Sequence, residues 1–362
     1  MATKRKSTSS EILRIIDANL NRCREALRVV EDVFRLGLSD KEASAEIKEM
    51  RHGLAAAARG FDRSGAGLLG ARDSASDVGR ELVVAGQKRA YAKMADMASA
   101  NMKRAEEALR VLAETARLAA PALAPPLERM RFEVYEIERK RLPRLSRRGR
   151  LENVLLYSLV TSAISPLPLP NMVKMLVDGG VDAIQLREKT MSDGAFARLA
   201  EKIGGACRKS GVLFIVNDRA DVAAAVGADG VHLGQGDLAP AHARKIMGER
   251  GIVGVSTRNL AMAGKALAEG ADYIAAGPVF ESQIAPGKEA IGPAAAGRVT
   301  RAADAPVFAI GGITASRLTL ALEAGCRRIA VCTALLWAKD PEAEARKFKQ
   351  ILKTNFRKAA NM

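Results

Sequence analysis

Two basic and two acidic side chains stand directly after short apolar segments of the sequence. Arg187 and Lys189 follow one segment, Asp218 follows a second and Asp237 follows a third. A pair of carboxylates suits Mg²⁺ when phosphate oxygens complete the shell of the ion, and the two cations suit the same phosphates. The residue types therefore predict a site for a diphosphate and its metal.

Other polar residues end segments in the same way. Gln185 and Asn217 close two apolar segments, and Ser256 follows another. Asp218 and Asp237 alone have a simpler explanation as helix caps, because Asp237 precedes a predicted helix. The nearby cations favour metal-diphosphate binding over capping.

Two later segments end in small residues. AIGGIT (309–314) holds Gly311 and Gly312, and CTALL (332–336) begins with Cys332 and Thr333. Glycines let backbone amides approach an anion, and a following helix adds its positive end, so a monophosphate site is expected here. A tight turn that requires small residues explains the same glycines, and the two explanations are compatible.

The apolar segments alternate with amphipathic helical patterns from residue 151 onward. Eight βα units in a stretch of this length predict a (β/α)₈ TIM barrel over residues 151–362, which gathers strand ends at one site. A doubly wound sheet is the alternative, but no GxGxxG opens its first helix. The expected strands are 155–161, 181–187, 212–217, 229–233, 251–255, 272–277, 306–312 and 327–333.

Residues 1–145 have a different pattern, which predicts an all-α domain with an internal repeat. Apolar residues at spacings of three and four mark one helix over 12–34 and another over 94–116, with further helices over 41–59 and 122–140. Polar residues repeat as well, displaced by 82 positions, since Asn19, Arg22, Glu25 and Arg28 recur as Asn101, Arg104, Glu107 and Arg110. Salt links within each helix, such as Glu25 with Arg28, and a shared polar site both explain the repeat.

Charge and composition narrow the class of protein. The net charge of +16 invites a nucleic-acid partner, but no binding motif appears and aromatic residues do not alternate with basic ones, which argues against nucleic acid as a partner. The segment 139–150 is strongly basic, and Pro143 and Gly149 predict that it is a solvated linker or domain edge without a helix, with contact to RNA or to acidic partners as the alternative. No apolar run is long enough to span a membrane, which predicts a cytoplasmic protein.

The second half resembles a known family, thiamine-phosphate synthase, also called thiamine-phosphate pyrophosphorylase. The resemblance runs in order through almost all of residues 151–340. It rests on QLREK (185–189), VNDR (216–219), GADGVHLGQGDL (227–238), GVS (254–256), ADYIAAGPVF (271–280) and AIGGIT (309–314).

The resemblance implies a reaction and a site. That family joins 4-amino-2-methyl-5-pyrimidinylmethyl diphosphate to a thiazole monophosphate and releases diphosphate. By resemblance, Asp218 and Asp237 hold Mg²⁺, and Arg187, Lys189, Ser256 and Lys288 are catalytic. The implied pyrimidine diphosphate site is Gln185, Leu186, Arg187, Glu188, Lys189, Asn217 and Ser256, and the implied thiazole phosphate site is Ser282, Gly311, Gly312, Cys332 and Thr333.

One loop departs from the family pattern. After GPVF the family has two threonines and a lysine, whereas here Ser282, Ile284 and Ala285 occupy those positions. Lys288 lies three residues after Ala285, and we expect its ammonium to take the place of the missing lysine. Arg258 also replaces a histidine that is common in the family.

The first half resembles the helical hydroxymethylpyrimidine-phosphate kinase domain often fused ahead of such synthases. The motifs are DANLNRCREALRVVED, ARDSASDVG and SANMKRAEEALRVLAET, and the implied substrates are ATP and the pyrimidine monophosphate. The candidate kinase residues are Asn19, Arg22, Arg28, Arg72, Asp73, Asp77, Asn101, Arg104 and Arg110.

Two other interpretations remain open. The barrel is also compatible with a thiazole tautomerase, although that enzyme needs a histidine where Thr257 and Arg258 stand. The helical half is also compatible with a non-catalytic dimerisation or RNA-binding module, and a homodimer is possible in either case.

Overall fold

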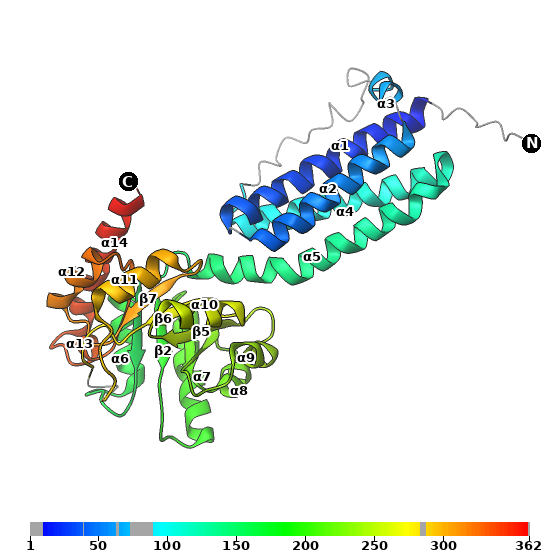
Figure 1. Ribbon diagram of the computed structural model, residues 1–362. Coiled ribbons are helices and arrows are strands. Elements are labelled where there is room, and N and C mark those ends of the chain that lie inside the picture. Colours follow the sequence, from blue (N-terminus) through cyan, green and yellow to red (C-terminus); the bar gives the residue numbers. More distant parts are fainter. Residues whose placement is uncertain (1–9, 39, 63–64, 73–89, 283–286, 361–362) are drawn as a thin grey trace, which may run out of the picture. The chain divides into compact units, whose positions relative to one another are not determined.

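The structure is a computed structural model that describes all residues except 1–9, 39, 63–64, 73–89, 283–286 and 361–362 (Figure 1). The chain divides into two compact units, Met1–Leu145 and Ser146–Met362. Among the described residues, none of the helices combines the length and the apolar character that a bilayer requires.

The second unit is a closed barrel of parallel strands, as the sequence predicts. Each strand pairs with the next, and β8 pairs with β1 to close the ring. All eight expected strands are present, although most are shorter than predicted. Their bounds are β1 Leu156–Val160, β2 Ala183–Leu186, β3 Leu213–Asn217, β4 Gly230–Leu233, β5 Ile252–Thr257, β6 Tyr273–Ala276, β7 Val307–Ile310 and β8 Arg328–Val331.

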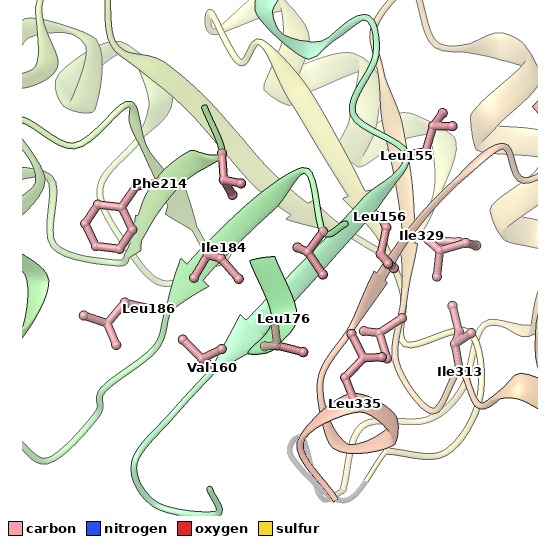
Figure 2. Close-up of a cluster of buried hydrophobic side chains, with 14 of the residues drawn as sticks. Leu155, Leu156, Val160, Leu176, Ile184, Leu186, Phe214, Ile313, Ile329 and Leu335 are labelled. Atoms are coloured by element: carbon pink, nitrogen blue, oxygen red, sulfur yellow. The ribbon is translucent and has the colours of Figure 1, made fainter. Parts of the chain in front are cut away.

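Helices follow the strands and cover the outside of the barrel (Figure 1). Alternate side chains of each strand point outward and pack under these helices, while the others fill the barrel interior. Figure 2 shows Val160, Ile184 and Leu176 in the outer core. The helices are α6 Leu169–Asp178, α7 Asp193–Lys209, α8 Ala220–Ala225, α9 Pro240–Met247, α10 Leu260–Ala268, α11 Gly292–Ala302, α12 Ala315–Glu323, α13 Thr333–Leu336 and α14 Pro341–Ala360.

The first unit is all-helical, and its two predicted apolar stripes pack together. Helix α1 lies against α4, and most of each stripe is buried, from Ile16 to Phe34 in one and from Ala98 to Ala116 in the other. The elements are α1 Ser10–Asp32, the π-helix η1 Val33–Gly37, α2 Lys41–Phe61, α3 Ala66–Gly70, α4 Met94–Ala119, the 3-10 helix η2 Pro121–Leu123 and α5 Ala124–Leu151.

Helix α5 corrects one prediction, because the basic segment 139–150 is helical and not a solvated linker. Pro143 lies inside the helix, where a proline costs about 3 kcal/mol. Ion pairs at the end of the helix offset that cost, since the buried side chain of Arg147 binds Asp272 at 2.8 Å and Arg150 binds Asp229. Charge alone did not reveal these acidic partners, which lie far away in the sequence.

Candidate active site

A cavity of about 430 Å³ opens at the C-terminal ends of the barrel strands. It brings together residues that the sequence assigns to two different substrates. The predicted site residues on its wall are Gln185, Arg187, Asn217, Ser256, Ser282, Lys288, Gly311, Gly312, Cys332 and Thr333.

The two predicted metal ligands lie side by side at the same end of the barrel. Lys189 forms an ion pair with Asp218, and Asp218 is hydrogen-bonded to Asp237. Burial raises the pKa of the Asp218 carboxyl above its ordinary value, and the hydrogen bond to Asp237 raises it further, while Lys189 opposes the shift. Burial also acts to raise the pKa of Asp237, but hydrogen bonds from Asp218 and the Gly234 amide outweigh it and lower the net value.

Helix capping does not explain these two carboxylates. Helix α8 begins after Arg219 and α9 begins after Ala239, so neither aspartate occupies the cap position. Asp237 instead accepts a hydrogen bond of 2.7 Å from the Gly234 amide within its own turn.

The backbone of Asp218 is strained. Its φ angle is +63°, and it is the one non-glycine residue with positive φ in the described part of the chain. Such a conformation costs of order 1 kcal/mol or more and persists where the surroundings impose it, often at functional sites. Here the Asp218 amide donates to the carbonyl of His232 at 2.8 Å, which ties the end of β3 to β4.

Two residues from the predicted diphosphate segment face away from the cavity. Leu186 is fully buried in the outer core under the helices (Figure 2). Glu188 accepts hydrogen bonds from the amide and hydroxyl of Ser162, at 2.6 and 2.7 Å. Because strand side chains alternate, the residues that reach the cavity from this segment are Gln185 and Arg187.

Both glycines of the AIGGIT turn need the absence of a side chain. Their φ angles are +99° for Gly311 and +63° for Gly312. A Cβ atom would lie 2.5 Å from Pro278 at the first position and 2.3 Å from the Glu281 carbonyl oxygen at the second. A tight turn and a phosphate site are therefore both compatible with these glycines, because the same backbone without side chains borders the cavity.

Cys332 lies on the wall of the same cavity as this turn. Burial raises the pKa of its thiol to about 12, and the charge of Arg187 opposes the shift. The thiol is therefore protonated at neutral pH, which argues against a role as a nucleophile.

The loop that departs from the family pattern reaches the same cavity. Ser282 and Lys288 both lie on the cavity wall, whereas Ile284 and Ala285 fall outside the described residues. Arg258 donates a hydrogen bond of 2.9 Å to the carbonyl of Glu289, the residue that follows Lys288. Arg258, which stands in place of the histidine common in the family, thus holds the loop next to Lys288.

A buried hydrogen-bond network crosses the barrel beneath the cavity, and the sequence did not reveal it. Gln185 Nε2 donates to Tyr157 at 2.7 Å, and the hydroxyls of Tyr157 and Tyr273 lie 3.0 Å apart. The Tyr273 hydroxyl lies 2.9 Å from His232 Nδ1, and His232 Nε2 lies 2.8 Å from Ser256 Oγ. We call these five residues the barrel network.

Two signals in the sequence could have indicated the barrel network. Tyr157 and Tyr273 occupy inward-facing positions of their strands, because each lies two residues before another inward-facing residue. The other inward-facing residues of these strands are small or aliphatic. Gly254, in the GVS motif, leaves room for the Tyr273 ring, because a Cβ there would lie 1.9 Å from it.

The helical unit places its candidate kinase residues in several different environments. Asn19 and Asn101 are buried, and each side-chain amide donates to the carbonyl four residues earlier, at 2.9 and 2.8 Å. Arg22 is exposed, and Arg104 donates to Asn101 at 3.2 Å. The two asparagines therefore have the same local role in both repeats.

The remaining arginines form ion pairs. Arg28 pairs with Asp32 at 3.4 Å and Arg110 with Glu114 at 3.1 Å, so the salt links within the helices exist but use other acids than Glu25 and Glu107. Arg72 binds the buried carboxylate of Asp17 through two hydrogen bonds of 2.8 Å. Asp73 and Asp77 lie outside the described residues.

Comparison with known families matches both halves of the chain. The family described as "Thiamine monophosphate synthase" matches residues 156–335. The family described as "ThiD2 family" matches residues 14–140. The two matches fall in the barrel unit and in the helical unit, respectively.

Similar proteins share nearly the whole chain. A thiamine-phosphate synthase of Nostoc punctiforme is 39% identical, covering 94% of this chain and 93% of that protein. One of Synechocystis is 38% identical, covering 97% and 99%. The solved thiamine phosphate pyrophosphorylase from Pyrococcus furiosus is 32% identical with a TM-score of 0.52, covering 56% of this chain and 96% of that one. The chain therefore belongs to the thiamine-phosphate synthase family.

Proposed function

We propose that the barrel unit joins 4-amino-2-methyl-5-pyrimidinylmethyl diphosphate to a thiazole monophosphate, giving thiamine phosphate and diphosphate. The observation that carries the proposal is the acidic pair Asp218 and Asp237, which lies with Lys189 at the end of the barrel that holds the cavity. The membership of the family supports the same reaction.

The reaction mainly requires stabilisation of the charges that develop in it. When the carbon–oxygen bond to diphosphate breaks, negative charge grows on the leaving group and a pyrimidine-stabilised cation remains. Arg187 on the cavity wall and Lys189, at the same end of the barrel, neutralise the leaving group, and the thiazole nitrogen then attacks the cation. The attacking nitrogen carries no proton to remove, so the reaction needs no general base.

The acidic pair fits Mg²⁺. Asp218 and Asp237 would hold the ion, since the two carboxylates lie close enough for each to shift the pKa of the other. Within the described residues, no group of three acidic, histidine or cysteine ligands is present, so phosphate and water oxygens would complete the shell, as Mg²⁺ prefers. When bound, the ion supplies positive charge to the departing diphosphate.

The test of this function uses the full chain and two purified substrates. We expect mass spectrometry to show thiamine phosphate only when both substrates and Mg²⁺ are present. Isomerisation of a thiazole without formation of thiamine phosphate would instead favour the tautomerase.

We further propose that the helical unit phosphorylates the pyrimidine monophosphate, with ATP as the phosphoryl donor. The match of residues 14–140 to the ThiD2 family supports this proposal. Arg22 and Arg104 occupy equivalent places in the repeat and are exposed, so they are the best placed of the candidates to bind phosphates. Arg28, Arg110 and Arg72 would first have to exchange their present carboxylate partners.

Two wider predictions remain proposals. The phosphorylated substrates favour the cytoplasm, because charged phosphates do not cross membranes unaided. We also propose that the chain forms a homodimer.

A further inference from the structure

The barrel network connects two parts of the cavity wall. Gln185, His232 and Ser256 lie on that wall, whereas Tyr157 and Tyr273 are buried beneath it. Gln185 uses Nε2 to bind Tyr157, and its buried Oε1 has no hydrogen-bond partner among the described residues. The amide thus leaves an acceptor, and not a donor, for a ligand.

The protons of this network are linked along its length. Each tyrosine hydroxyl has one proton, and the buried ring of His232, which lies between two hydroxyls, carries one as a neutral imidazole. Gln185 donates to the Tyr157 hydroxyl, so the proton of Tyr157 points to the Tyr273 hydroxyl. The proton of Tyr273 in turn points to His232 Nδ1. The remaining ring proton is then on Nε2, which donates to Ser256 Oγ.

The direction of the network decides what Ser256 offers to a ligand. With Oγ accepting from His232, the serine proton is free to donate to a phosphate oxygen. In the reverse direction, Ser256 would donate to His232 and offer only lone pairs, which a diphosphate cannot use. A diphosphate at Ser256 therefore selects the direction in which Gln185 presents Oε1.

We propose that the barrel network couples diphosphate binding at Ser256 to recognition of the pyrimidine amino group at Gln185. Tyr157, Tyr273 and His232 are then positioning residues that determine specificity for an amino over an oxo substituent. A keto oxygen at that place would face the Gln185 Oε1 and leave two buried acceptors without a donor. This inference rests on the proposed synthase function.

The first test compares two substrates. It measures kcat/KM for the 4-amino pyrimidinylmethyl diphosphate and its 4-oxo analogue in the full chain and in Tyr157→Phe and Tyr273→Phe. We expect wild-type preference for the amino substrate on the order of 10⁴-fold, as in sites that bind a substrate N–H group. The preference should fall at least about tenfold in each variant, because the amide of Gln185 is no longer held in one orientation.

A matched control is Tyr135→Phe, which removes a tyrosine hydroxyl from the helical unit and should leave the preference unchanged. Circular dichroism melting would show whether each variant is folded. Unchanged preference in both folded barrel variants would overturn the coupling.

The second test leaves all five residues of the barrel network unchanged, so it does not depend on the folding of the tyrosine variants. The other two histidines, His52 and His242, are exposed, and His52→Gln with His242→Gln leaves His232 as the single imidazole. Nitrogen-15 NMR should show its proton on Nε2 in the presence of Mg²⁺ and inorganic diphosphate. A proton on Nδ1 would contradict the coupling.

The outcomes separate this inference from the function on which it rests. A wild-type chain that forms no thiamine phosphate would overturn the synthase function and the coupling together. An active wild-type chain with a proton on Nδ1, or with unchanged preference in the folded variants, would overturn the coupling alone.

Discussion

At the scale of single residues, Asp218 combines a strained backbone with a carboxylate that is costly to ionise. Its φ angle is +63°, and its pKa is raised by burial and by Asp237. When the pKa of an acid is higher in the folded state than in the unfolded state, the protein loses stability as pH rises through that pKa. Ionised Asp218 therefore destabilises the protein at neutral pH, which is the kind of cost expected at a functional site.

We expect Asp218→Asn to stabilise the protein and to impair synthesis. Asparagine tolerates positive φ and carries no charge, while the lost ion pair with the half-exposed Lys189 is worth only about 0–1 kcal/mol. At pH 7 without Mg²⁺ the Tm should rise by roughly 2–4 °C, which corresponds to about 1 kcal/mol. Differential scanning calorimetry would measure it.

The pH dependence provides the control for this prediction. As pH falls below the raised pKa, Asp218 becomes protonated in the wild-type protein and the difference in Tm should shrink. A difference that grows at acidic pH, or a variant that melts earlier at pH 7, would show that the ionised carboxylate is stabilising.

The displaced lysine gives a second prediction at this scale. Lys288 is the one lysine on the cavity wall among the described residues. We expect Lys288→Ala to lower kcat by about 10- to 100-fold, because a cation near the developing charge is removed. Lys265→Ala is the matched control, since that exposed side chain pairs only with Glu269 on its own helix. Wild-type turnover in Lys288→Ala would show that the lysine does not replace the missing one.

At the scale of elements, the end of α5 is predicted to stabilise the barrel unit. Arg147 and Asp272 are both nearly inaccessible, with 8% and 5% of their side chains exposed. Removing one partner of a buried pair costs about 3–5 kcal/mol, although Arg244, at 2.5 Å from Asp272, retains part of the interaction. We therefore expect Arg147→Ala to lower the free energy of unfolding by about 3 kcal/mol in a urea titration.

Arg148→Ala provides the comparison. Arg148 pairs with Asp304 at 2.9 Å, but both side chains are substantially exposed, so its loss should cost under about 1 kcal/mol. Equal losses in the two variants would indicate a general charge effect and not a buried contact.

Sequence patterns predicted these elements to different degrees. The strands and the paired helices α1 and α4 follow from periodicity, because burial on one face leaves a regular apolar pattern. The helical end of α5 was predicted wrongly, since Pro143 argues against a helix locally and the stabilising acids lie in distant segments.

The site was predictable where strand ends carry charged residues. Arg187, Lys189, Asp218 and Asp237 stand at such ends, and the barrel topology brings them to one end. The barrel network was not predicted, because Tyr157 and Tyr273 look like ordinary core residues until the closed barrel brings β1 and β6 together across its interior.

At the scale of the whole molecule, the proposal gives the chain two consecutive reactions. The full chain with Asp218→Asn should still convert the pyrimidine monophosphate and ATP to the diphosphate, which should accumulate because the barrel is impaired. The wild-type chain given the monophosphate, ATP and thiazole phosphate should form thiamine phosphate. Chromatography of the products would measure both, and absence of the diphosphate from the variant would contradict the kinase proposal.

The most direct test of the account is the Mg²⁺ dependence of diphosphate release by the full chain. If Asp218 and Asp237 hold the ion against the leaving group, Asp237→Asn should lower kcat by on the order of 100-fold and require at least about tenfold more Mg²⁺ for half-maximal rate. An Asp237→Asn variant with wild-type turnover and wild-type Mg²⁺ dependence would contradict it.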